Sequence, residues 1–249
     1  MHPPELRVRA RQLHLSGASV SETARSLGLA YRTVWEWCRE RPEPVVQGTG
    51  LRCFRCRADV DNPTDQPAYC YLLGLYLGDG HLVTTARVPV LRISCSEVWA
   101  GLIDACEAAM RDVLAARVQR VQQQGCVSVQ SYGKHWPCLL PQHGPGRKHE
   151  RPIVLTDWQR DIVAAHPGDF LRGLFHSDGC RFANRVVVRD KEYVYPRYMF
   201  TNESVDIMGL CQWALDLLGI AWRMNRRNSL SVARRGAVAA LDRHVGPKF

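Results

Sequence analysis

Two ten-residue segments determine the expected fold of this chain: YLLGLYLGDG at Tyr71–Gly80 and FLRGLFHSDG at Phe170–Gly179. In each segment a glycine stands five residues before an Asp-Gly pair. Small residues at helical spacing let two helices approach backbone to backbone, while the leucines around them seal the contact. The small residues expected at this helix pair are Gly74, Gly78, Gly173 and Ser177.

The acidic residues of the two segments, Asp79 and Asp178, are expected at the C-terminal ends of these helices. The helix macrodipole is negative there, and two neighbouring carboxylates also repel each other. A divalent cation bound by hard oxygen ligands relieves both penalties. We therefore predict that Asp79 and Asp178 bind Mg²⁺ or another divalent cation. The following residues, Gly80 and Gly179, are expected in the left-handed conformation that ends many helices.

Each segment begins a longer repeated unit. After the first come the strand-like VLRISCSE, a helical pattern from Trp99 to Val113, and then RVQRVQQQ and VSVQSYGK. After the second come RYMFTNES, a helical pattern from Ile207 to Leu218, and then AWRMNRRN and LSVARR. The order helix, strand, strand, helix, strand, strand, helix therefore occurs twice, which predicts a duplicated α+β fold of αββαββα units. The AGLIDA sequence at 100–105 lacks the Asp-Gly pair, so we interpret Asp104 as a solvated helix residue.

Two of the strand-like segments alternate apolar and polar side chains. In VLRISCS and in AWRMNRR one face would pack in the core while the other presents hydrogen-bond donors. Arginine binds guanine bidentately in the major groove, and Asn or Gln binds adenine in the same way. A solvated antiparallel face is the alternative. The residues of this part of the chain that we expect to contact DNA are Arg92, Arg223, Asn225, Arg227, Arg234 and Arg235.

The charge of the chain favours a polyanionic partner. Lys and Arg number 33 against 24 Asp and Glu, which gives a formal net charge of +9. From Ala221 to Phe249 there are seven basic residues and one acidic residue, Asp242. Nucleic acid is a common partner of basic proteins, although a surplus that serves solubility is the alternative. No long apolar run occurs, so we expect neither a signal peptide nor a membrane span, and a cytoplasmic location.

Residues 5–41 have the pattern of a helix-turn-helix. A first helix is expected to end near Gly17, and SVSETARSLG and LAYRTVWEWCRER supply the next two. Ser19 and Glu22 form a capping-box pattern, and Gly28 stands where the turn requires it. An ordinary helical hairpin is the alternative. The expected small core is Ala24, Leu29, Val34 and Trp37. The residues expected to face DNA are Tyr31, Arg32 and Thr33.

Cysteine spacing indicates a possible zinc site. Ten cysteines in a long chain without an export signal are expected to be reduced thiols. Cys53 and Cys56 form a CxxC knuckle, which is half of a tetrahedral zinc site, and free cysteines in a turn are the alternative. The thiols and imidazoles that could complete it are Cys70, Cys138, His143 and His149, of which Cys138 and His143 are the predicted ligands.

The repeated segments, read as LLGLYLGDG and LRGLFHSDG, resemble the motif of the single-chain LAGLIDADG homing endonucleases, also called DOD-type, and of the intein endonuclease domains. The resemblance covers about the last 180 residues. It implies a DNA-binding saddle of two pseudo-symmetric halves, with Asp79 and Asp178 as metal ligands and basic residues beside them. Lys148 and Lys248, which follow their aspartates at nearly equal distances, are the best matches, and Lys134 is a rival in the first half.

Two positions and one added module depart from that family. An acidic residue often found two positions before the metal ligand is replaced by Leu77 and His176. An N-terminal helix-turn-helix is unusual for a stand-alone homing enzyme and is similar to sporulation-type transcription regulators that keep a degenerate LAGLIDADG domain. Those regulators typically lose the motif acids, whereas this chain has both.

The expected organisation is a helix-turn-helix domain at 1–45, a linker with the CxxC knuckle at 46–70, and a two-repeat domain at 71–249 with repeats at 71–150 and 168–249. The leading hypothesis is a monomer with internal two-fold pseudo-symmetry that binds double-stranded DNA, without membrane association, and hydrolyses it with a divalent cation. A transcription regulator that binds DNA without cutting is the second hypothesis. A zinc-stabilised module that contacts other proteins is the third, and it predicts no salt-sensitive DNA affinity.

Overall fold

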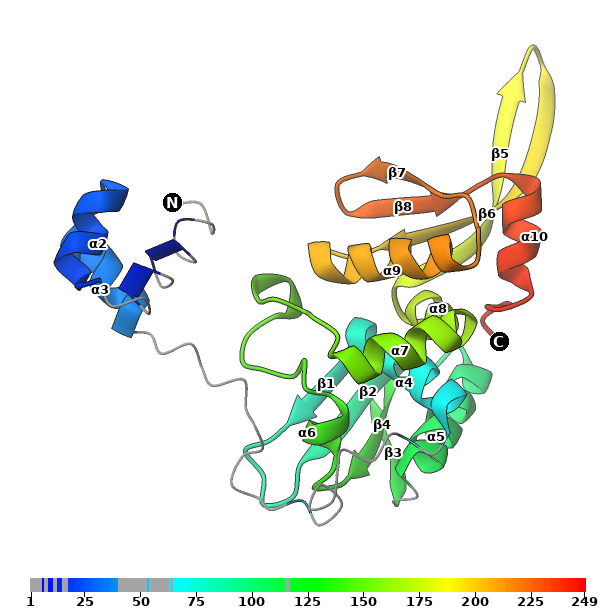
Figure 1. Ribbon diagram of the computed structural model, residues 1–249. Helices are drawn as coiled ribbons and strands as arrows, with labels where there is room; N and C mark the ends of the chain where they lie inside the picture. Colours follow the sequence, from blue (N-terminus) through cyan, green and yellow to red (C-terminus); the bar gives the residue numbers. More distant parts are fainter. Residues whose placement is uncertain are drawn as a thin grey trace. The chain divides into compact units, whose positions relative to one another are not determined.

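The computed structural model describes residues 6, 9–10, 13–14, 18–39, 53, 63, 65–114 and 117–249 (Figure 1). The chain divides into two compact units, Met1–Thr49 and Gly50–Phe249. Each unit has its own buried apolar cluster. Among the described residues, no helix has both the length and the apolar character needed to cross a lipid bilayer.

The first unit contains helix α2 (Val20–Leu27) and helix α3 (Tyr31–Arg39). The expected capping box is present, because the Ser19 backbone N–H donates to Glu22 and the Glu22 backbone N–H donates to Ser19 Oγ. Gly28 ends α2 at φ 62°, in the left-handed region that favours glycine. The predicted small core is confirmed, with Ala24 and Val34 buried and Leu29 and Trp37 packed against them. The expected first helix, which was placed to end near Gly17, falls largely outside the described residues.

The second unit begins with the first repeat of the predicted element order. The elements are α4 (Gln66–Asp79), β1 (Gly80–Val83), β2 (Val90–Ser96), α5 (Ala100–Leu114), β3 (Val118–Gln123), β4 (Cys126–Tyr132) and the short α6 (Trp136–Leu139). The strands form an antiparallel sheet in the order β1-β2-β4-β3. A 3₁₀ turn, η2 (Lys148–Glu150), and helix α7 (Asp157–Ala165) then lead to the second repeat.

The second repeat has the same element order. It consists of α8 (Pro167–Asp178), β5 (Gly179–Val188), β6 (Lys191–Thr201), α9 (Val205–Leu217), β7 (Arg223–Arg226), β8 (Ser229–Val232) and α10 (Arg235–Asp242). Its sheet has the order β5-β6-β8-β7, position for position the order of the first sheet. The tip of the β5–β6 ribbon projects away from the rest of this sheet (Figure 1). The predicted duplicated α+β fold is therefore confirmed, and each repeat begins with its Asp-Gly helix.

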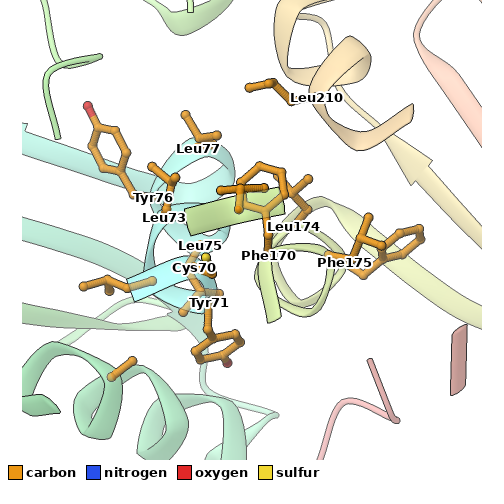
Figure 2. Close-up of a cluster of buried hydrophobic side chains, with 14 of the residues drawn as sticks. Cys70, Tyr71, Leu73, Leu75, Tyr76, Leu77, Phe170, Leu174, Phe175 and Leu210 are labelled. Carbon is orange, nitrogen blue, oxygen red and sulfur yellow. The ribbon is translucent and has the colours of Figure 1, made fainter. Parts of the chain in front are cut away.

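Helices α4 and α8 lie side by side at the centre of the second unit. Leucine and aromatic side chains of both helices form a buried apolar cluster around this helix pair (Figure 2). A Cβ built on Gly74 would lie 2.5 Å from the carbonyl oxygen of Phe170, and one on Gly173 would lie 2.2 Å from that of Tyr71. The helices therefore touch through their backbones, as the small residues of the two motifs predicted.

The glycines after the aspartates correct one expectation. Gly80 has φ −88° and Gly179 has φ −102°, so both are extended and neither is left-handed. A Cβ on Gly80 would lie 2.4 Å from Cα of Tyr76, and one on Gly179 would lie 2.6 Å from Cα of Phe175. The chain turns directly from helix into strand at these positions, and glycine is needed because the strand passes close to the preceding helical turn.

Candidate functional site

The two motif aspartates end neighbouring helices, Asp79 at α4 and Asp178 at α8. The Asp178 carboxylate lies 3.0 Å from the position that a Cβ would occupy on Gly78, the residue before Asp79. A larger residue at position 78 would also collide with the Ser177 side chain. The tight helix pair thus brings the two carboxylates, from opposite repeats, to one junction.

The two lysines occupy equivalent positions at this junction. Lys148 Nζ donates to the carbonyl oxygens of Tyr76 and Gly78, at 2.5 Å and 2.7 Å, in the last turn of α4. Lys248 Nζ donates to the carbonyl oxygen of Ser177, at 3.2 Å, in the last turn of α8. Each ammonium group therefore neutralises the negative end of its own repeat's motif helix. Lys134, the rival position, is exposed in the turn after β4.

Each lysine shares a hollow with the aspartate of the other repeat. A hollow of about 490 Å³ is lined by Asp178 and Lys148, together with His81 and Thr201. A smaller hollow of about 90 Å³ is lined by Asp79 and Lys248, with Ser94, Ser96 and His176 on its wall. This exchange between repeats could not be deduced from the sequence, because equal spacing along the chain does not say which aspartate a lysine faces.

A buried histidine and the C-terminal residues hold Lys248 in position. His176 Nε2 donates to the carbonyl oxygen of Val245 at 3.1 Å, and its Nδ1 accepts a hydrogen bond from the Tyr71 hydroxyl at 3.1 Å. Burial lowers the pKa of His176 to about 4, so this ring is neutral at pH 7. Phe249 packs on Gly101 of α5, and its carbonyl oxygen accepts from the Leu102 backbone N–H. In the sequence His176 is recognisable only as a departure from the motif that the segment resembles, and nothing there indicates this positioning contact.

The electrostatics at the junction favour cation binding. Burial and, to a smaller extent, the neighbouring Asp178 raise the pKa of Asp79 to about 6, while Lys148 and Lys248 oppose the shift. Burial also raises the pKa of Asp178, against a 2.7 Å hydrogen bond that Asn202 donates to its Oδ2. Burial lowers the pKa of Lys148 to about 8. The two carboxylates thus repel each other, with two lysines nearby. Their oxygens are the hard ligands that Mg²⁺ prefers.

The raised pKa of Asp79 predicts a measurable pH dependence. A carboxyl group whose pKa is higher in the folded than in the unfolded chain destabilises the fold as pH rises from about 4 to above 6. Although its carboxyl group is partly desolvated at the junction, Asp79 is still partly exposed, so solvent screening reduces the expected effect to about 1 kcal/mol, and Asp79→Asn should remove it. Chemical denaturation of the wild type and of Asp79→Asn, at several pH values and without added divalent cation, measures this pH dependence of the unfolding free energy. If the difference in unfolding free energy between the wild type and Asp79→Asn were the same at pH 4 and pH 7, the raised pKa assigned to Asp79 would be wrong.

The residues predicted to contact DNA lie on several elements. Arg92 on β2 is exposed beside buried Leu91 and Ile93, and this strand alternates as predicted. Arg223 and Asn225 lie on β7, where Asn225 accepts a hydrogen bond from buried Ser231. Arg234 and Arg235, both exposed, begin α10. In the first unit, Tyr31 and Arg32 are exposed and Thr33 is half-buried on α3.

Arg227 corrects the alternation predicted for β7. A bulge between Met224 and Arg226 shifts the register, so Arg226 pairs with Ser229. Arg227 lies beyond the strand and forms an ion pair with Glu203 at 2.9 Å. A bulge inserts one residue into the alternation, which a strict two-residue period does not anticipate. The AGLIDA segment lies on α5 as expected, where exposed Asp104 is an ion-pair partner of Arg120.

The predicted zinc ligands are brought together only in part. Cys53 and Cys138 lie in one cluster, and its third member is His135. His143, the predicted imidazole, instead lines a small hollow with Tyr76 and Lys148, away from that cluster. Cys56 lies outside the described residues.

Comparisons with known proteins give similarities of fold at low identity. No family model matches the chain, and no curated protein matches it. Mesophilic variants of the homing endonuclease I-DmoI match with a TM-score of 0.46 and 14% identity, over 72% of this chain and 90% of theirs. The LAGLIDADG meganuclease I-AabMI bound to uncleaved DNA matches with a TM-score of 0.44 and 12% identity, over 71% of this chain and 83% of its own. The N-terminal LAGLIDADG domain of DUF199/WhiA matches with a TM-score of 0.45 and 15% identity, over 75% of this chain and 87% of its own.

Proposed function

We propose that this chain binds double-stranded DNA across its two sheets and hydrolyses phosphodiester bonds at the junction of α4 and α8. The observation that carries the proposal is the pair of hollows in which each motif aspartate faces the lysine of the other repeat. Two equivalent acid–lysine sites, close together and related by the repeat, match the two strands of a duplex. A single structural ion pair would not require this duplication.

The sheet faces beside the hollows support DNA as the substrate. Residues paired directly across an antiparallel sheet point to the same face, so His81, Arg92 and Gln130 share one face of the first sheet. The side chains of Thr201 and Ser229 share the equivalent face of the second sheet. His81 and Thr201 also line the larger hollow, and therefore these faces and the acidic junction open to the same side.

The charges at the junction fit phosphodiester hydrolysis. The Asp79 and Asp178 carboxylates would supply oxygen ligands, and two lysines balance their charge before any phosphate arrives. A bound divalent cation such as Mg²⁺ supplies Lewis-acid and water-activating chemistry for this reaction. Lys148, with a pKa of about 8, is mostly protonated at pH 7 and would stabilise charge developing on the phosphate. Lys248 would do the same in the other hollow.

A second candidate function is sequence-specific binding without cleavage. It is favoured by α2 and α3, which are joined at left-handed Gly28 and present Tyr31 and Arg32 to solvent. These features fit a helix-turn-helix module, whose second helix enters the major groove. A regulator of this kind would use the sheets for affinity only.

A cleavage screen separates the two functions. Purified protein is incubated with a plasmid library of randomised sites and Mg²⁺, and the DNA ends are sequenced. We expect recurrent breaks at one long site, and none when EDTA replaces Mg²⁺. Retarded DNA without breaks at any divalent cation concentration would favour the regulator, and the absence of salt-sensitive binding would contradict both functions.

A further inference from the structure

A cluster of two thiols and one imidazole lies in the second unit, with none of the acidic-junction residues among its members. One ligand atom from each of Cys53, His135 and Cys138 lies within 4.8 Å of the other two. Cys53 Sγ is 3.1 Å from His135 Nδ1. His135 is buried, and both cysteines are half-buried. Ligand atoms bound to one tetrahedral zinc ion are about 3.5–3.8 Å apart, so these three side chains need only small adjustments to hold one.

Local structure aligns two of the three ligands in advance. His135 and Cys138 stand on one helical turn, where the Cys138 backbone N–H donates to the His135 carbonyl oxygen at 3.0 Å. Residues three apart on such a turn share a face. Between them, Trp136 is fully buried and anchors α6 in the core of the first repeat. The turn therefore places His135 and Cys138 on one side as a His-x-x-Cys pair.

The third ligand comes from a distant part of the sequence. Cys53 lies before α4, in a CxxC segment whose spacing is typical of zinc knuckles. Thiolate and imidazole donors together favour Zn²⁺ over Mg²⁺ or Ca²⁺, which take oxygen ligands. We propose that Cys53, His135 and Cys138 bind a structural Zn²⁺ as three of its ligands.

Such an ion would have a structural role. Because Cys53 and the α6 turn are far apart in the sequence, a shared zinc ion would tie two segments together, which is the structural role of thiolate-rich zinc sites. It would join Cys53 to the turn after β4, so the part of the chain enclosed between its ligands would contain α4, α5 and the four strands of the first repeat. The proposal is independent of DNA cleavage, because none of these residues lines the hollows of Asp79 or Asp178.

Metal analysis of the full-length protein tests the site. We expect about one zinc ion per chain after purification without added zinc. Cys53→Ser and Cys138→Ser should each weaken Zn²⁺ binding at least about ten-fold, as measured by competition with a chromogenic chelator. The Co²⁺-loaded wild-type protein should show the spectrum of a tetrahedral thiolate site, a readout that does not depend on variant folding.

Two control variants remove a thiol and an imidazole that lie outside the cluster. Cys180→Ser removes an exposed thiol on β5, and His143→Gln removes the imidazole that the sequence favoured. Both should retain the full zinc content. Wild-type protein that neither contains zinc nor binds Co²⁺ tetrahedrally would overturn the proposal, as would a disulfide between Cys53 and Cys138.

Discussion

Replacing Asp79 and Asp178 together by asparagine is expected to lower Mg²⁺-dependent DNA cleavage about a thousand-fold or more. Asparagine keeps the shape of each side chain but removes the charge on which cation binding depends. Loss of two negative charges beside DNA should leave duplex affinity equal to or higher than that of the wild type. Cleavage rates and gel-shift affinities on the same selected duplex separate the two effects.

Asp104→Asn is the matched control for this pair. Asp104 stands in the AGLIDA sequence that imitates the motif, but it is exposed on α5 and pairs with Arg120. This variant should cut DNA at the wild-type rate. A double aspartate variant that cuts as fast as Asp104→Asn would remove the proposed chemistry, even if DNA binding persisted.

Replacing Gly74 or Gly173 by alanine is expected to lower the free energy of unfolding by about 3 kcal/mol, or to prevent folding. The new methyl group would lie 2.5 Å from the Phe170 carbonyl oxygen or 2.2 Å from that of Tyr71. Both obstacles are backbone atoms, so the helices themselves must separate. Separation would also move the two aspartates apart. Chemical denaturation, followed by circular dichroism, measures the loss of stability.

Gly209→Ala supplies the control for a glycine within a helix. Gly209 lies on an exposed part of α9, and no atom approaches its would-be Cβ within 4 Å. Alanine there should stabilise the protein by up to about 1 kcal/mol through helix propensity. If Gly74→Ala shifted the unfolding midpoint no more than Gly209→Ala does, the helix contact would not be as close as described.

The repeated architecture could be predicted because two kinds of pattern agreed along the chain. Alternation in VLRISCS and helical spacing from Trp99 to Val113 each appear in the structure as expected. The motif glycines predicted a close helix pair, because a glycine at such a position leaves room for the backbone of a neighbouring helix. The roles of Gly80 and Gly179 were predicted wrongly, because the sequence does not show whether a glycine is required for a left-handed backbone conformation or for a close contact with a neighbouring segment.

The composition of the candidate site was predictable only in part. Motif position identified Asp79 and Asp178, and equal spacing identified Lys148 and Lys248. Which lysine faces which aspartate depends on packing between the repeats, and that is not a property of either repeat alone. The zinc cluster illustrates the same limit, because His135 and His143 flank Cys138 in the chain and only the turn at α6 selects His135.

The position of bound metal relative to Asp79 and Asp178 tests the central claim most directly. Crystals of the protein with its selected duplex and Mn²⁺ can be measured at a wavelength where manganese scatters anomalously. We predict anomalous peaks about 2.0–2.6 Å from carboxylate oxygens of both aspartates, beside a DNA phosphate. Carboxylates too far apart to meet at one phosphate, or manganese bound only elsewhere, would contradict the account.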